Sequence, residues 1–275
     1  MKSMDIAVII PTYNRAHTLK RCLDSVLNQT VKPAEIIVVD DGSSDRTKTL
    51  IEECYSTIDY FYQENKGVSA ARNMGIAQAG CKWIALLDSD DEWLPTKLER
   101  QKNQLFHSGL LVCHSNEIWI RNGVRVNQMN KHKKYGGDIF SNSLKMCAMS
   151  PSSILFDRSL WSQYNGFDES YPVCEDYALW LKISCDYLVD YINEPLIKKY
   201  GGHDDQLSRR YFAMDKYRIM AIQEILHKTT LTDEKRYEAK AMVLAKLKIL
   251  EKGAIKHDNH ELLLFCQKVF KTLSS

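Results

Sequence analysis

Short apolar runs alternate with segments of helical periodicity over the first 90 residues. From Leu19 to Leu27, apolar side chains recur every three or four positions, which is typical of an amphipathic helix. Strands that alternate with helices predict crossover units and a mostly parallel sheet, and strands without polar alternation predict a sheet covered on both faces. The apolar runs of strand length are residues 6–10, 35–39, 60–62 and 83–87.

The middle of the chain, roughly residues 108–170, has a less regular pattern. Residues 110–113 and 118–120 suit a hairpin pair, and the Asn-Gly dipeptide at 122–123 suits a later turn. Residues 131–137 are polar, and we expect them to form a mobile loop. This region therefore predicts fewer regular elements than the segment before it.

Helical periodicity returns at Glu175 and again over residues 210–275, where the spacing predicts two or three amphipathic helices. We therefore expect an α/β unit over residues 1–205 and a helical C-terminal extension over residues 206–275. The 275 residues, of which 44% are hydrophobic, suffice for one sizeable core or for one core with an appendage.

Charge is distributed unevenly between these two parts. The whole chain has a formal net charge of +2, but residues 206–275 contain 14 Lys and Arg against 8 Asp and Glu. A basic extension can favour anionic lipid head groups or an acidic partner, and a solvated helical face rich in lysine is the alternative. We therefore expect peripheral membrane contact as one option, and no nucleic-acid partner.

Two features of the sequence concern the cellular compartment. No stretch reaches the ~18–20 apolar residues of a membrane-spanning helix, and the N-terminus lacks the longer apolar region of a signal peptide. The eight cysteines are scattered without a C-x-x-C pair, which argues for reduced thiols rather than disulfides or a zinc site. We expect a cytoplasmic protein, with the inner face of a membrane as a further location.

Polar clusters follow three of the predicted strands where the strands end. Ligands bind at the carboxyl ends of the strands in sheets of this kind. We therefore expect the clusters to meet at one rim of the sheet. They are Thr12-Tyr13-Asn14, Asp40-Asp41 and Asp88-Ser89-Asp90-Asp91.

Asp88 and Asp90 form a D-x-D pair directly after a buried strand. Carboxylates in one loop suit a hard divalent cation, Mn²⁺ or Mg²⁺, which would neutralise a diphosphate and help it to leave. His203 could supply a third metal ligand. A D-x-D pair is also common in solvated acidic loops, and a lone histidine in a loop is more often structural.

Charged side chains also occur at two predicted helix starts. Arg72 lies between two glycines where a helix begins, and a helix N-terminus with a guanidinium makes an anion site. Glu175 and Asp176 begin another helix, where a carboxylate can accept a proton from an incoming hydroxyl or can simply complement the helix dipole. Sequence alone leaves open which of the two points into a cleft.

Six motifs follow one another along the chain: IIPTYNR (9–15), VVDDGSSD (38–45), GVSAARNMGI (67–76), LLDSDD (86–91), GFDE (166–169) and CEDYALWLK (174–182). Each is short, but six in this order form a specific signal. Together they resemble glycosyltransferase family 2 over about residues 5–205. The resemblance implies a GT-A type α/β fold, with a Rossmann-like, mixed but mostly parallel sheet flanked by helices, followed here by the C-terminal helical extension.

The resemblance also implies a nucleotide-sugar site. Pro11 would shape the loop after the first strand. Thr12, Tyr13 and Asp41 would form the nucleobase pocket, with Tyr13 stacking on the base and Asp41 accepting from a base N–H. His203 resembles a late histidine that touches metal or diphosphate in some members.

The other implied roles concern the reaction centre. Arg72 would contact the nucleotide or the diphosphate, and Asp88 the ribose or the donor sugar. Asp90 would ligate the metal. Asp176 would be the catalytic base, with Glu175 as the competing choice.

These roles define an inverting, metal-dependent hexosyltransferase. It would move a sugar from a nucleotide-diphosphate donor to a hydroxyl of a glycan or lipid-linked acceptor, in the synthesis of a cell-surface polysaccharide. The expected donor is a UDP-sugar, and dTDP- and GDP-sugars are the next candidates. The acceptor is expected against residues 130–170, with Ser152, Ser153 and Phe167 as candidate contacts. The alternatives are a catalytically inactive nucleotide-sugar-binding protein and a sugar nucleotidyltransferase. The latter calls for a Gly-rich basic loop after the first strand, which residues 11–15 lack.

Overall fold

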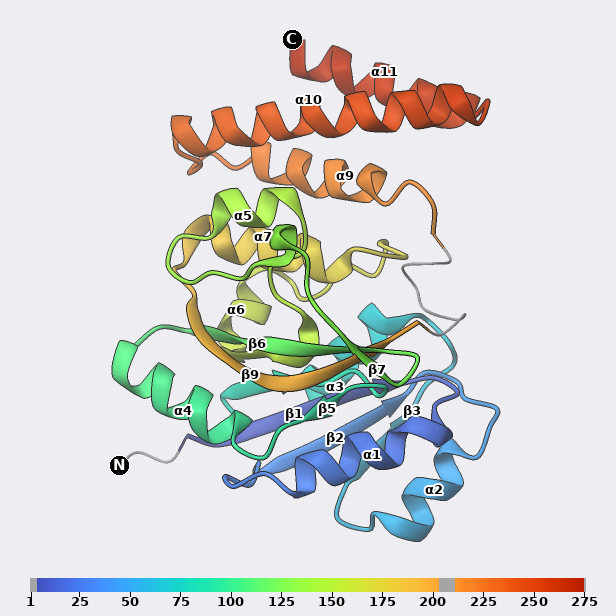
Figure 1. Cartoon of the computed structure of the whole chain (residues 1–275), viewed down its shortest axis with the longest axis vertical. Coiled ribbons are helices and arrows are strands. Elements are labelled where there is room, and N and C mark those ends of the chain that lie inside the picture. Colours follow the sequence, from blue (N-terminus) through green and yellow to red (C-terminus); the bar gives the residue numbers. More distant parts are fainter. Residues whose placement is uncertain (1–3, 203–210, 275) are drawn as a thin grey trace.

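The computed structural model describes residues 4–202 and 211–274, and its strands form one mixed sheet (Figure 1). In this part of the chain the strand order is β3-β2-β1-β4-β8-β6-β9-β5, and β7 pairs with β6. The strands are β1 (Ile6–Thr12), β2 (Glu35–Asp40), β3 (Asp59–Tyr62), β4 (Trp83–Leu86), β5 (Glu92–Trp93), β6 (Val112–Arg121), β7 (Val124–Val126), β8 (Ile154–Asp157) and β9 (Asp190–Gly201).

Helices lie on both faces of this sheet, and the last ones are stacked beyond one face (Figure 1). The α-helices are α1 (Ala16–Leu27), α2 (Thr47–Cys54), α3 (Val68–Gln78), α4 (Lys97–Ser108), α5 (Phe140–Lys145), α6 (Arg158–Gln163), α7 (Glu175–Asp186), α9 (Asp215–Leu226), α10 (Asp233–Lys256) and α11 (His260–Ser274). The 3₁₀ helices are η1 (Asn130–His132) and η2 (Pro151–Ser153).

The four strands predicted for the first 90 residues form the parallel half of the sheet. β1 pairs with β2 and with β4, and β2 pairs with β3, all in parallel. Every residue of β1 is buried, as expected for a strand covered on both faces. α1 and α2 pack on one face and α3 on the other. The carboxyl ends of β1, β2 and β4 therefore lie at one edge of the sheet, as predicted.

The predicted hairpin over residues 110–120 is wrong, because β6 runs without a break from Val112 to Arg121. Its pairing with β9 shifts in register on both sides of Asn116, and the extra residues at these shifts lie on β9, so β6 itself stays continuous. The turn predicted at the Asn-Gly dipeptide is confirmed. Asn122 and Gly123 both have positive φ, 49° and 77°, and they join β6 to β7.

The polar segment 131–137 is anchored rather than free along its length. The side chain of Lys134 is only 7% exposed, and its ammonium lies 2.9 Å from Glu117 Oε2. A lysine held in this way fixes the middle of the segment against β6.

The C-terminal helices share a core with the sheet-bearing part of the chain. One continuous cluster of buried apolar residues extends from α5 and α7 through α9 and α10 to α11. In Figure 1 these helices are stacked in that order above the sheet. The helices predicted after residue 210 are thus present, whereas the predicted unit boundary at 205 falls outside the described residues and stays a prediction.

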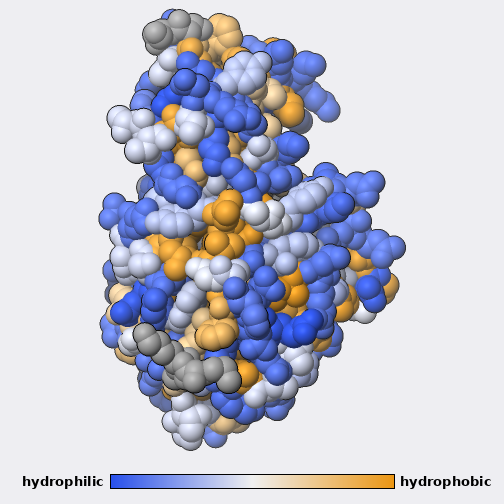
Figure 2. All heavy atoms as spheres, turned by 90° about the vertical axis from the view of Figure 1, so that its left-hand side faces the viewer, coloured by the Kyte–Doolittle hydropathy of each residue, from blue (hydrophilic) through white to orange (hydrophobic). Residues whose placement is uncertain are grey.

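On the side seen in Figure 2, hydrophilic residues cover most of the surface, and apolar residues are scattered among them. Among the described residues, no helix combines the length and the apolar content needed to cross a membrane.

Lys97, at the start of α4, is buried inside this fold. Its ammonium donates to Gln101 Oε1 at 2.7 Å and lies 3.9 Å from the centre of the Trp93 ring. Burial lowers the pKa of Lys97 from 10.5 to about 7. Between these two pH values the unfolded chain therefore binds more protons than the folded one, so this lysine makes stability rise with pH across that window.

We predict that Lys97→Met gains stability relative to the wild type as the pH falls. The gain between pH 9.5 and pH 6 should be about 2–3 kcal/mol, because the variant no longer buries a protonated ammonium at low pH. Urea unfolding at both pH values measures it. Lys48→Met, at a side chain that is 65% exposed, is the control and should show no such trend. An equal stability difference at both pH values for Lys97→Met would contradict the prediction.

Candidate functional site

The acidic loop at residues 88–91 is held in place by a serine and by β9. The backbone N–H of Asp88 donates to Ser152 Oγ at 3.1 Å, and this hydroxyl donates to Asp91 Oδ2 at 2.6 Å. The backbone N–H of Tyr200 donates to Asp91 Oδ1 at 2.9 Å. Asp91 therefore fixes the loop from inside, whereas Asp88 and Asp90 are only half-buried.

A second contact anchors the same loop from α1. Arg21 Nη2 donates to the backbone carbonyl of Asp90 at 2.6 Å, and its guanidinium lies 3.7 Å from the centre of the Tyr200 ring. Burial and the neighbouring carboxylate of Asp90 raise the pKa of Asp91 well above its usual value. The raised pKa disfavours ionisation of Asp91 next to the other carboxylates of the loop.

Arg72 joins this loop to α7. Its Nη2 donates to Asp88 Oδ1 at 2.8 Å, and its Nη1 donates to Glu175 Oε1 at 2.6 Å. The side chains of Arg72 and Glu175 are 4% and 7% exposed, so this ion pair is buried. The guanidinium also lies 5.3 Å from the centre of the Phe167 ring. Residues that the sequence assigned to separate motifs therefore form one connected group.

The two adjacent acidic residues at the start of α7 have different partners. Glu175 is paired with Arg72, whereas Asp176 is half-buried and forms no ion pair with any residue that the structure describes. Asp176 Oδ2 accepts from the thiol of Cys147 at 3.2 Å, and its Oδ1 accepts from the backbone N–H of Tyr177 at 2.6 Å. Burial, and then the charge of Asp176, raise the pKa of Cys147, so this thiol stays a neutral donor.

The residues predicted for the nucleobase pocket lie at the ends of β1 and β2. Pro11 and Thr12 are buried, whereas the side chain of Tyr13 is 45% exposed. An aromatic ring that is exposed at a strand end can stack on a ligand, which is the role that the family resemblance implies for Tyr13.

Asp41 is buried and organises the loop after β3. Its Oδ1 accepts from Gln63 Nε2 at 2.6 Å and from the backbone N–H of Lys66 at 2.8 Å. Its Oδ2 accepts from the backbone N–H of Gly67 at 2.9 Å. A carboxylate has about four acceptor positions, so about one is left for the predicted contact with a base N–H.

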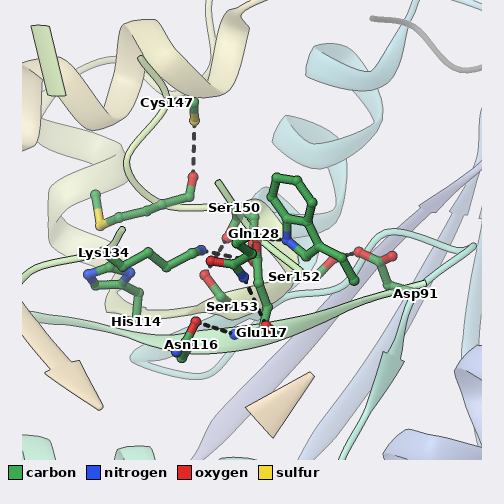
Figure 3. Close-up of polar contacts among 12 residues, drawn as sticks. Asp91, His114, Asn116, Glu117, Gln128, Lys134, Cys147, Ser150, Ser152 and Ser153 are labelled. Carbon is green, nitrogen blue, oxygen red and sulfur yellow. Dashed lines mark hydrogen bonds and ion pairs between the residues drawn. The ribbon is translucent and has the colours of Figure 1, made fainter. Parts of the chain in front are cut away.

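A buried polar network that the sequence did not reveal lies beside the acidic loop (Figure 3). Glu117 Oε2 lies 2.9 Å from the ammonium of Lys134 and accepts from Ser150 Oγ at 2.7 Å. Burial opposes ionisation of Glu117, but Lys134 and Lys199 outweigh it and hold its pKa well below the usual value. The sequence did not indicate this network because Glu117 lay within the wrongly predicted hairpin and Lys134 within a segment predicted to be a mobile loop.

The acceptor contacts proposed from the sequence are wrong. Ser152 and Ser153 are fully buried, and the side chain of Phe167 is only 1% exposed. Their hydroxyls and ring serve the fold: Ser152 ties the acidic loop, and Phe167 packs against Trp180 with ring centres 5.7 Å apart. Acceptor contacts must come from other residues.

The residues predicted to hold a metal fit a divalent cation in part. Asp88 and Asp90 supply carboxylate oxygens, the ligands that Mg²⁺ and Mn²⁺ prefer. Within the described residues, no group of three or more His, Cys, Asp or Glu could hold a metal ion. His203, the predicted third ligand, lies outside the described residues. The two carboxylates therefore suit a cation that completes its coordination with substrate oxygens and water.

Comparisons of the fold with solved structures agree with this architecture. The fold matches that of residues 1–349 of TarS from S. aureus in complex with UDP-GlcNAc, with a TM-score of 0.79, 18% identity, and coverage of 98% of this chain and 80% of that one. It also matches the mannosyltransferase PcManGT from Pyrobaculum calidifontis in complex with GDP-Man and Mn²⁺, with a TM-score of 0.61, 16% identity, and coverage of 96% and 83%. The predicted GT-A type fold with C-terminal helices is confirmed.

Sequence relatives identify the family. The Escherichia coli UDP-Glc:alpha-D-GlcNAc-diphosphoundecaprenol beta-1,3-glucosyltransferase WfgD is 34% identical over 210 residues, which cover 75% of this chain and 81% of the relative. An uncharacterized glycosyltransferase of Rickettsia bellii is 32% identical over 200 residues, 72% of this chain but only 29% of the relative, so the chain spans less than a third of that protein. Residues 7–163 match the family model of glycosyl transferase family 2. The chain therefore belongs to glycosyltransferase family 2.

Proposed function

We propose that this protein is an inverting glycosyltransferase that transfers a hexose from a UDP-sugar to a hydroxyl of a lipid-linked glycan, in the synthesis of a cell-surface polysaccharide. The observation that carries the proposal is the buried Arg72, which joins Asp88 to Glu175, beside the half-buried Asp176. The activity for which WfgD is named, a glucosyl transfer from UDP-Glc to GlcNAc-diphosphoundecaprenol, supports this donor and acceptor. The UDP-GlcNAc bound to TarS supports the same donor class.

Asp176 is the proposed catalytic base. Glu175 already neutralises Arg72, so its carboxylate is engaged, whereas Asp176 accepts from a thiol and a backbone N–H among the residues that the structure describes. Asp176 would take the proton from the acceptor hydroxyl while the hydroxyl oxygen attacks the anomeric carbon from the face opposite the diphosphate. Glu175 would act as a positioning residue that holds Arg72.

The donor would lie across the carboxyl ends of β1, β2 and β4. Tyr13 would stack on the nucleobase, with Thr12 and Asp41 shaping the pocket around it. Asp88 would contact the ribose or the donor sugar. Both terminal nitrogens of Arg72 already bind carboxylates, which supports a role in orienting Asp88 besides the predicted contact with the diphosphate.

A divalent cation is the proposed cofactor. Asp90 would hold Mn²⁺ or Mg²⁺ at the acidic loop, and His203 stays a predicted ligand. The Mn²⁺ in the structure of PcManGT supports this choice of metal. When bound, the cation would neutralise charge on the departing diphosphate.

We expect release of UDP from a UDP-hexose in the presence of a GlcNAc-diphosphate lipid acceptor, with less release of GDP or dTDP from their sugars. Asp176→Asn should lower the rate of transfer by about 10²–10⁴-fold, because the variant lacks the proton acceptor. Mass spectrometry of the lipid product and nucleotide release measure both results.

Two control measurements test the role of Asp176 as the base and distinguish an enzyme from a binding protein. Circular dichroism checks that Asp176→Asn is folded, and near-wild-type transfer by the folded variant would remove Asp176 from the role of base. UDP binding without any glycosylated product from the wild type would instead favour an inactive nucleotide-sugar-binding protein.

Removal of divalent metal should abolish most of the transfer. We expect dialysis against EDTA to lower the rate by at least about tenfold and Mn²⁺ to restore it, because the diphosphate otherwise leaves against uncompensated charge. Asp90→Asn should need a higher Mn²⁺ concentration for half-maximal rate. Full activity after chelation, with residual metal measured by elemental analysis, would overturn the metal proposal.

The exposed face of α10 is the proposed contact with an anionic membrane. Exposed lysines and apolar side chains share this helix, so a bilayer surface could take up both its charge and its apolar groups. The exposed lysines and apolar residues of this face are Lys240, Ala241, Leu244, Ala245, Lys248, Ile249, Lys252, Ile255 and Lys256, and the acidic Glu251 lies among them.

We expect flotation with vesicles that contain phosphatidylglycerol, and no flotation with phosphatidylcholine alone. The double variant Lys248→Glu/Lys252→Glu should bind at least about tenfold more weakly, since each lysine near an anionic surface contributes about 1 kcal/mol. The matched control Lys32→Glu/Lys48→Glu, which reverses two exposed lysines of the first 205 residues, should float like the wild type. Equal binding by all three proteins would contradict this surface.

A further inference from the structure

Lys199 brings a positive charge to the candidate site that no motif assigned. It lies near the end of β9, where the parallel pairing with β6 places it beside Trp119. The backbone N–H of the next residue, Tyr200, donates to Asp91 Oδ1 at 2.9 Å. The peptide that joins Lys199 to Tyr200 therefore lies directly against the acidic loop.

The side chains of the two adjacent lysines of β9, Lys198 and Lys199, lie on opposite faces of the sheet. Side chains alternate along a strand, so Lys198 and Lys199 point in opposite directions. The ammonium of Lys198 lies 2.8 Å from Glu92 Oε1, and both residues line a surface groove of about 660 Å³ with residues of α1. Lys199 therefore directs its charge away from that groove.

Carboxylates of the candidate site keep Lys199 charged. Burial disfavours its ammonium form, but Glu117, Asp91 and Asp88 outweigh burial and raise its pKa above the usual value. The thiol of Cys147, which donates to Asp176, also lies within the field of Lys199. The charge of Lys199 thus acts both on the acidic loop and on the thiol that contacts the proposed base.

The carboxylates that act on Lys199 are themselves bound at short distance by residues other than Lys199. Glu117 is paired with Lys134 at 2.9 Å, Asp88 with Arg72 at 2.8 Å, and Asp91 accepts from Ser152 at 2.6 Å. The contacts found over residues 4–202 and 211–274 include no hydrogen bond or ion pair to the ammonium of Lys199. It is a half-buried cation that can accept an anionic ligand without breaking an existing pair.

We propose that Lys199 binds the diphosphate of the nucleotide-sugar donor and stabilises the nucleoside diphosphate as it leaves. This inference rests on the proposed function. In that reaction the acceptor oxygen forms a bond to the anomeric carbon as the bond from this carbon to the β-phosphate oxygen breaks. The proton goes to Asp176 and the electron pair goes to the diphosphate, whose growing negative charge a fixed ammonium stabilises.

Binding of UDP and of uridine tests this role without catalysis. Calorimetry in EDTA and again in Mn²⁺ should show that Lys199→Met weakens UDP binding by about 10–100-fold, since hydrogen bonds to charged groups contribute about 1.5–3 kcal/mol. Uridine, which has no phosphate, should bind the variant and the wild type equally. Lys199→Arg should keep UDP affinity within a few-fold.

The neighbouring lysine provides the matched control. Lys198→Met, on the opposite face of β9, should leave UDP affinity within about twofold of the wild type, because the ammonium of Lys198 is paired with Glu92. Thermal unfolding checks each variant, and Lys199→Gln replaces Lys199→Met if the latter does not fold. Unchanged UDP affinity in the neutral variant would overturn the proposal.

Two other outcomes are separable. A parallel loss of UDP and uridine binding would show that Lys199 maintains the pocket rather than binding the diphosphate, and it would also overturn the proposal. Failure of the wild type to bind either ligand would refute the proposed function itself. Tighter binding of UDP than of uridine by the wild type supports that function, and the Lys199 variants then decide the role of the lysine.

Discussion

Arg72 holds its charge out of water by contacts with carboxylates from two distant parts of the chain. Asp88 is 16 positions away in sequence and Glu175 is 103 positions away. Moving an ion from water into a protein interior costs several kcal/mol, so the guanidinium and its two partners depend on one another. Their mutual dependence fixes the start of α7 against the end of β4. It also sets where Asp176, the next residue of α7, lies relative to the acidic loop.

The rest of the site follows from the need to balance negative charge. Three aspartates lie within four positions after β4, and the raised pKa of Asp91 reflects their crowding in a buried place. Arg72 compensates Asp88, and the charge of Lys199 acts on both Asp88 and Asp91. A loop that is balanced in this way can stay ordered without a ligand and still offer two half-buried carboxylates.

The part of the site on parallel strands could be predicted from the sequence, because apolar strands that end in polar residues have one geometric outcome. Parallel pairing brings the ends of β1, β2 and β4 to one edge, so the strand pattern places Tyr13, Asp41 and Asp88 there, and the family resemblance implies their roles. Arg72 was identified with them. Its pairing with Glu175 was not, because contacts across about 100 positions depend on packing rather than on local pattern.

Other features depend on direction, which periodicity does not specify. Successive helical residues point about 100° apart, so only the fold separates Glu175 from Asp176. A serine reads the same whether its hydroxyl meets an acceptor or, like Ser152, ties an inner loop. β6 continues through polar positions where the pattern predicted a hairpin, so Glu117 was not identified as part of a strand. The sequence around Lys199 is that of an ordinary strand. Only the alternation of side chains along the observed strand shows that Lys199 lies on the face opposite Lys198.

The continuous core of α5, α7, α9, α10 and α11 has a consequence for modular exchange within the family. α7 carries Glu175 and Asp176 at its first turn, and one side of the helix packs in the same cluster as the C-terminal helices, through Tyr177, Ala178, Leu181 and Cys185. A graft that replaced those helices with the corresponding segment of a relative would change the support of the proposed base. Chimaeras that aim at a new acceptor should therefore transfer α5 and α7 together with the C-terminal helices.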